Sequence, residues 1–97
     1  TLDVAKALID EGFHPMTIYF PLIASGAMLI EPTETETKDT LDQFIGTMVK
    51  IAKQATSKNA PALHSAPRYA PRKRLDETKA ARNPILRWTE NQSISPV

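Results

Sequence analysis

The first third of the chain changes from helical to strand-like spacing of its apolar residues. Apolar side chains that recur every three or four residues define one helix face, namely Leu2, Ala5, Leu8 and Ile9. Charged residues occupy the other face, namely Asp3, Lys6, Asp10 and Glu11. Gly12 follows and can take the left-handed conformation that commonly ends a helix. Because Pro15 disfavours a helical backbone at His14, a turn over residues 13–16 is expected.

Two short apolar segments then predict a pair of strands. Residues 17–20 are β-branched or aromatic and are followed by Pro21. Residues 27–30 form a second apolar run between Ser25-Gly26 and Glu31-Pro32. Strands so close in sequence are expected to pair antiparallel, although the pattern does not specify their register.

The strongest periodicity predicts a long helix over residues 37–56. Its apolar positions follow the i, i+3, i+4, i+7 rule: Leu41, Phe44, Ile45, Met48, Ile51, Ala52 and Ala55. Thr33 and Glu36 have the spacing of a capping box, and Thr35 or Thr37 could equally cap this helix. Helix, two strands and long helix together predict an α+β fold of two layers, with helices over one face of a short antiparallel sheet.

The pattern weakens after Thr56, so the core is expected to come mainly from the first 56 residues. Prolines at four positions divide the rest: Pro61, Pro67, Pro71 and Pro84. A short helix is predicted near 76–82, and residues 91–97 are expected to be disordered. Ile85, Leu86 and Trp88 could anchor the tail on another surface, and either Leu63 or residues 85–88 could extend the sheet. The chain thus divides into an α+β domain over 1–60 and an extended tail over 61–97.

Composition excludes several classes of function. The chain has 97 residues and no cysteine, so a disulfide framework, a thiolate nucleophile and a cysteine zinc site are excluded. The net charge of +1 gives no strong attraction to nucleic acid or membrane, and the apolar runs are too short to span a bilayer. These features favour a cytoplasmic protein. The chain begins at Thr1 inside a helical pattern, and we expect it to be part of a longer protein.

Few residues suggest chemistry by themselves. His14 lies in a turn, where functional residues are common, although a packed or surface histidine is the plainer interpretation. Glu31 ends the second predicted strand and could be either an acid–base group or a structural carboxylate. His64 lies too far from His14 in sequence for a metal-ligand spacing. Arg68, Arg72, Lys73 and Arg74 surround Tyr69, but acidic residues follow at once, so nucleic-acid binding is not favoured.

Several phrases at their observed spacing resemble one enzyme family. They are Gly-Phe-His-Pro-Met-Thr over 12–17, Met-Leu-Ile-Glu-Pro-Thr-Glu-Thr-Glu over 28–36, the spacing of Leu41-Asp42-Phe44-Ile45, and the tail phrases over 74–77, 80–84 and 86–88. Together they resemble the C-terminal region of glycine dehydrogenase (decarboxylating), the P-protein of the glycine cleavage system. The tail phrases resemble the second subunit of its two-chain type.

The resemblance implies the small C-terminal domain of a fold-type-I, aminotransferase-like enzyme that uses pyridoxal phosphate (PLP). In this family glycine is decarboxylated and its aminomethyl group passes to the lipoyl arm of H-protein. The PLP lysine belongs to the large domain, so this chain would bind no cofactor and would be inactive alone. The implied partners are the rest of its subunit, glycine dehydrogenase subunit 1, H-protein and glycine.

The resemblance also ranks the candidate residues. His14 becomes the leading catalytic candidate, with Thr17 beside it, and Glu31 and Arg68 become candidates at the substrate entrance. Arg68 departs from the family, which usually has histidine after Ala-Pro, where this chain has Ala66-Pro67-Arg68. The alternative is a non-catalytic interaction module that docks through Ile85, Leu86 and Trp88.

Overall fold

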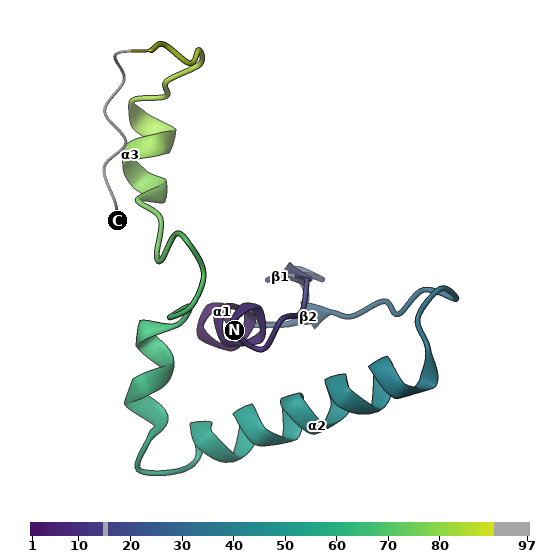
Figure 1. Ribbon diagram of the computed structural model, residues 1–97. Helices are drawn as coiled ribbons and strands as arrows, with labels where there is room; N and C mark the ends of the chain where they lie inside the picture. Colours follow the sequence, from purple (N-terminus) through teal and green to yellow (C-terminus); the bar gives the residue numbers. More distant parts are fainter. Residues whose placement is uncertain (15, 91–97) are drawn as a thin grey trace.

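The computed structural model describes residues 1–14 and 16–90, and it begins with the predicted amphipathic helix (Figure 1). Helix α1 spans Leu2–Asp10 and ends in the backbone hydrogen bond from Gly12 to Ile9. Gly12 has a φ of +89°, the left-handed conformation expected of a glycine after a helix. The prediction for this helix and its end is confirmed.

The two predicted strands pair antiparallel but are shorter than expected. Strand β1 spans Thr17–Ile18 and β2 spans Met28–Leu29, with Thr17 opposite Leu29 and Ile18 opposite Met28. The regular strand stops after Ile18: Tyr19 still donates to the Ala27 carbonyl at 2.7 Å, but its φ of +57° turns the backbone out of the strand. The expected strand over 17–20 was therefore too long by two residues.

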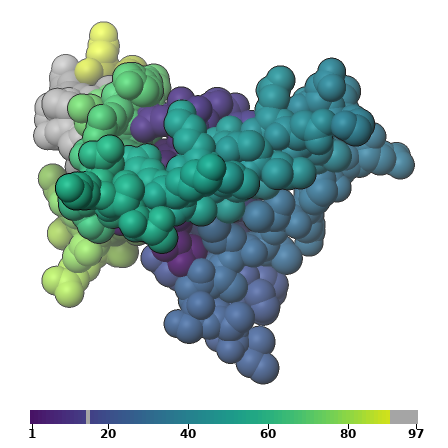
Figure 2. Space-filling model, turned by 90° about the horizontal axis from the view of Figure 1, so that it is seen from below, coloured from purple at the N-terminus to yellow at the C-terminus, as the bar shows by residue number. Residues whose placement is uncertain are grey.

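Helix α2 spans Lys38–Ala55, close to the predicted 37–56 (Figure 1). Thr37 is its N-cap, because the Thr37 hydroxyl accepts a hydrogen bond of 3.1 Å from the backbone N–H of Thr40. Of the three threonines that the sequence left open, Thr37 is therefore the cap. Figure 2 shows α2 as a long ridge across one side of the molecule.

The core lies mainly between helices, and the sheet sits at its margin. Its buried members come from α1, α2 and the 3₁₀ helix η1, which spans Ala60–Ser65, and from the residue after it: Ala7, Leu8, Ile51, Leu63 and Ala66. Met28 of β2 packs against this cluster from the side, together with Phe44 and Met48 of α2. The α+β class is thus confirmed, while Leu63 and Ala66 add a contribution that the weak pattern after Thr56 did not predict.

The last part of the described chain extends away from this core as an arm (Figure 1). Helix α3 spans Glu77–Arg82, matching the helix predicted near 76–82, and none of its residues is buried. Ile85, Leu86 and Trp88 are also exposed. Among residues 1–14 and 16–90 the sheet has two strands, so neither Leu63 nor residues 85–88 extend it. The disorder predicted for 91–97 lies outside the described residues.

Candidate functional site

One open pocket lies between the strand ends and the first turns of α2. Its volume is about 390 Å³. It is lined by the link from α1 to β1, the end of β2 and the start of α2: Phe13, His14, Met16, Thr17, Leu29, Ile30, Glu31, Pro32, Thr33, Glu36, Thr40, Leu41 and Phe44. We call this the strand–helix pocket. It contains three of the four residues that the sequence proposed as site candidates, His14, Thr17 and Glu31.

His14 is held at the pocket by its neighbour in sequence. The backbone N–H of Phe13 donates to the carbonyl of Leu8 at 3.0 Å, so the chain turns back against α1 directly after Gly12. The Phe13 ring packs edge-on against Phe44 of α2, with ring centroids 5.3 Å apart. Since Phe13 is fixed to both helices, the adjacent His14 is placed at the pocket while its side chain stays exposed.

Thr17 and Glu31 reach the same pocket from the two strands. Thr17 opens β1 and pairs with Leu29, and Glu31 follows β2 by two residues. Antiparallel pairing therefore brings positions 17 and 31 to one end of the sheet, although 14 residues separate them in sequence. The side chains of His14, Thr17 and Glu31 have no hydrogen-bond partner among the residues that the structure describes, so they are available to a ligand.

The strand–helix pocket is acidic. Glu31 and Glu36 line it, and none of its described lining residues is a lysine or an arginine. Apart from His14, the remaining lining is apolar or carries hydroxyl groups. A negatively charged ligand would meet two carboxylates here, so the pocket suits a neutral or cationic group better than an anion.

Arg68 lies in a different place. It lines a second pocket of about 240 Å³, together with Asp10, Lys50 and Tyr69. The backbone N–H groups of Arg68 and Tyr69 donate to the Asp10 carboxylate at 2.7 and 2.9 Å, and the Arg68 guanidinium donates to the Ala62 carbonyl at 3.4 Å. The structure thus separates Arg68 from the other three candidate residues.

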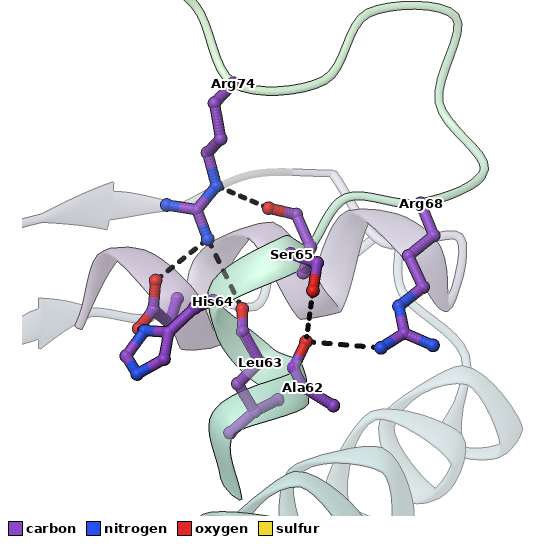
Figure 3. A network of polar contacts seen from close by, with 8 residues as sticks. Ala62, Leu63, His64, Ser65, Arg68 and Arg74 are labelled. Atoms are coloured by element: carbon purple, nitrogen blue, oxygen red, sulfur yellow. Dashed lines mark hydrogen bonds and ion pairs between the residues drawn. The ribbon is translucent and has the colours of Figure 1, made fainter.

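A polar network joins α1 to the segment after η1 (Figure 3). Arg74 donates to Asp3 Oδ1 at 2.8 Å and to the carbonyls of Leu63 and Ala66, while His64 Nδ1 lies 2.7 Å from Asp3 Oδ2. The hydrogen bond from Arg74, aided by the charges of His64 and Arg74, holds the pKa of the Asp3 carboxyl below its usual value, although partial burial opposes this shift. Arg74, one of the basic residues around Tyr69, is therefore held by contacts within the domain.

The described residues offer no metal site, and the strand–helix pocket does not fit PLP. Within residues 1–14 and 16–90, no group of three His, Cys, Asp or Glu side chains could hold a metal. None of the seven lysines of the chain lines the strand–helix pocket, and its two glutamates would repel a phosphate group. In the same part of the chain, no helix has the length and apolarity that a membrane span requires.

Sequence reasoning missed the share of α2 in the pocket. Thr40, which lines it, was not singled out, and Leu41 and Phe44, which also line it, were predicted as apolar positions of the helix. Their spacing placed them on the apolar face of one helix, but which other element this face meets depends on long-range packing. The one available signal was Thr40, a hydroxyl residue beside that face in the first turn.

The fold and the open pocket define a small α+β domain. A family model described as "Glycine dehydrogenase, C-terminal domain" matches residues 1–70, and the chain belongs to this family. The resemblance inferred from the phrases over 12–17 and 28–36 is therefore confirmed.

Similar proteins share the name that the resemblance implied. The chain is 63% identical over 90 residues to the "Probable glycine dehydrogenase (decarboxylating) subunit 2" of Caldanaerobacter subterraneus subsp. tengcongensis, covering 93% of this chain and 18% of that protein. It is 60% identical over 88 residues to the protein of the same name from Caulobacter vibrioides, covering 91% of this chain and 17% of the relative. The chain thus spans less than a fifth of the length of these relatives.

Proposed function

We propose that this chain serves as the C-terminal domain of a glycine dehydrogenase subunit 2 and forms one wall of the enzyme's active-site entrance. The observation that carries this proposal is the convergence of His14, Thr17 and Glu31 on the strand–helix pocket. Two separate segments, residues 12–17 and 28–36, supply these three side chains, and both belong to the phrases that resemble the P-protein. The family match supports the assignment of the domain, and the pocket supports its role.

In this proposal the cofactor is held outside the chain. PLP supplies the electron sink for decarboxylation of glycine when it is bound to a fold-type-I large domain. The absence of a lysine in the strand–helix pocket, and its acidic lining, favour a cofactor site in the part of the subunit beyond these residues. This domain then contributes orientation and exclusion of water, and it is inactive alone.

The acidic lining also discriminates between two possible ligands of the pocket. The carboxylate of glycine would be repelled by Glu31 and Glu36, whereas the lipoyl arm of H-protein is a long neutral chain with an apolar body. The walls formed by Phe13, Leu41 and Phe44 suit such a chain. We therefore propose that His14 and Thr17 orient the lipoyl arm, and that Glu31 lies at the rim.

His14 is the group best suited to proton transfer in this pocket. An exposed imidazole can both accept and donate a proton. Arg68 does not line this pocket, and its contacts with Asp10 and Ala62 favour a structural role. The remainder of the subunit, subunit 1 and H-protein are the partners of the proposed cytoplasmic enzyme.

Substitution of His14 tests the proposal in the complete enzyme. His14→Ala should lower the turnover of glycine decarboxylation and aminomethyl transfer at least about tenfold, because general acid–base groups commonly contribute factors of this size or larger. His64→Ala is the matched control, since His64 is also exposed but lies in the network around Asp3.

The loss should depend on the acceptor. If His14 orients the lipoyl arm, the variant should be impaired more severely with lipoylated H-protein than with free lipoate. Equal kinetics for His14→Ala and the native enzyme with both acceptors would remove the assigned role.

An interaction module is the second candidate, favoured by the exposed side chains of Ile85, Leu86 and Trp88 on the arm. A free-standing module should be a stable monomer in solution. A severed C-terminal domain should instead self-associate, or fold weakly, until the rest of its subunit is added.

A further inference from the structure

An uncharged, apolar loop projects between the two strands. Residues 19–23 are Tyr-Phe-Pro-Leu-Ile, and we call them the apolar loop. Leu22 is 88% exposed and Ile23 is 95% exposed, while Tyr19 and Phe20 are about half exposed. In Figure 2 the blue segment after β1 stands out from the body. Consecutive exposed apolar side chains of this size mark a contact surface.

The loop has a defined conformation. The backbone N–H of Tyr19 donates to Ala27 at 2.7 Å, and that of Ala24 donates to Pro21 at 3.1 Å. Tyr19 keeps its φ of +57°, which a bulky residue adopts only where its surroundings impose it. A loop that is already ordered loses little conformational entropy when it docks, which favours binding.

Charge limits what can cover the loop. No Asp, Glu, Lys or Arg occurs between Glu11 and Glu31, so the loop offers nothing for a charged surface to recognise. The arm of a second copy would bring Lys79, Arg82 and Arg87 close to its apolar residues. Such charges lose hydration on burial without gaining a partner here, so this occupant is disfavoured.

Thr1 lies against Gly26, at the end of the β1–β2 hairpin connection that leads into β2. Thr1 Oγ1 donates to the Gly26 carbonyl at 2.6 Å. Gly26 has a φ of +67°, and a Cβ built on it would lie only 3.0 Å from Thr1 Oγ1. Chain that precedes Thr1 would therefore emerge beside this hairpin. In the relatives, more than four fifths of the subunit lies outside the matched region.

We propose that the apolar loop docks into an apolar hollow on the preceding part of the same subunit and fixes this domain against it. The inference rests on the proposed function, in which the chain is the C-terminal domain of a longer subunit. The covalent connection to the preceding part of the subunit enters at Thr1, beside Gly26. The apolar loop supplies a second contact with that same part.

Thiol labelling in the full-length subunit tests this contact. The 97 residues contain no cysteine, so Ile23→Cys introduces a single thiol into the domain, and mass analysis of its peptide separates it from cysteines elsewhere. Lys58→Cys is the matched control, because Lys58 is exposed and lies in the turn between α2 and η1. Both rates are divided by the rate of the same thiol in the urea-unfolded subunit.

In the subunit alone, without its partner subunit, Ile23→Cys should react at least tenfold more slowly than Lys58→Cys. Leu22→Cys should show the same protection. Equal rates at the loop and control positions would overturn the proposal. Protection that appears only when the partner subunit is added, or that disappears on dilution, would assign the loop to a subunit interface or to a second copy, and would also overturn it.

This result is separable from the proposed role of the strand–helix pocket. Labelling measures the contact of the apolar loop and does not depend on catalysis, whereas His14→Ala measures catalysis. Protection at Ile23→Cys with unchanged kinetics of His14→Ala would retain the docking contact and reject the assigned site.

Discussion

At the scale of single residues, two aspartates on one face of α1 organise the segment that follows η1. Asp3 binds the side chains of Arg74 and His64, and Asp10 binds the backbone N–H groups of Arg68 and Tyr69. The seven-residue spacing of the two aspartates could be read from the sequence as a shared helix face. Their partners could not, because these lie about 60 to 70 residues away. The charged face of α1 is therefore a contact face within the domain.

The lowered pKa of Asp3 predicts how this contact depends on pH. A carboxyl whose folded pKa lies below its unfolded value, about 4, stabilises the fold above that value and loses the contribution as pH falls through the folded pKa. Asp3→Asn should therefore destabilise the domain by about 1 kcal/mol at neutral pH. The difference from the native chain should shrink below about pH 4, as measured by urea unfolding across pH.

Asp42→Asn is the control for that series. Asp42 pairs with Lys38 one helical turn away, and both side chains are largely exposed, so the expected cost is at most about 0.5 kcal/mol. A stability difference for Asp3→Asn that persists unchanged into strong acid would contradict the proposed ion pairing.

The candidate site was predictable in part at this scale. His14, Thr17 and Glu31 were identified from the family phrases, and the structure brings all three to one pocket. Phe44 and Thr40 were not identified, because local spacing cannot show which turn of a helix faces a distant strand end.

At the scale of elements, agreement with the sequence follows the strength of the local signal. Helix α2 has five turns of apolar periodicity and was predicted to within a residue at either end. The strands were overestimated because the aromatic residues at 19 and 20 have high strand propensity, while a positive φ at Tyr19 cannot be seen from residue type. Helix η1 was missed since a 3₁₀ helix has little periodicity, although Pro61 in its first turn was a usable signal.

The cap of α2 gives a prediction that belongs to this scale. Thr37→Ala should lower the free energy of unfolding by about 1 kcal/mol, because the N–H of Thr40 loses its side-chain acceptor. Thr35→Ala is the matched control, since Thr35 only exchanges a hydroxyl contact with Thr33 and should have a much smaller effect. Urea unfolding followed by circular dichroism measures both. An equal loss for the two variants would show that the cap had been misassigned among the three threonines.

At the scale of the whole molecule, the domain presents surfaces that it does not cover itself. The apolar loop, the strand–helix pocket and the arm are all exposed, while the buried core is confined to the junction of α1, α2 and η1. The sequence of the arm also occurs in the Caldanaerobacter relative. The match to that protein covers 90 of the 97 residues, so it must include residues 8–90. The α+β class could be predicted from local pattern. The projection of the arm could not, since it depends on the absence of packing partners within these residues.

These exposed surfaces are expected of a domain that completes a larger enzyme. We propose that the chain contributes a wall of the active-site entrance and that the lysine that holds PLP lies elsewhere. All seven lysines of the chain lie outside the strand–helix pocket, and Lys38 and Lys50 are paired with Asp42 and Glu11.

The measurement that tests this claim most directly is borohydride reduction of the complete PLP-loaded enzyme, followed by peptide mapping. Reduction attaches PLP permanently to the lysine that holds it, and mass analysis identifies that lysine. We predict one stoichiometric label in the part of the subunit that precedes these 97 residues, and none on the seven lysines here. A stoichiometric label on any one of these seven would place the cofactor in this domain and contradict the account.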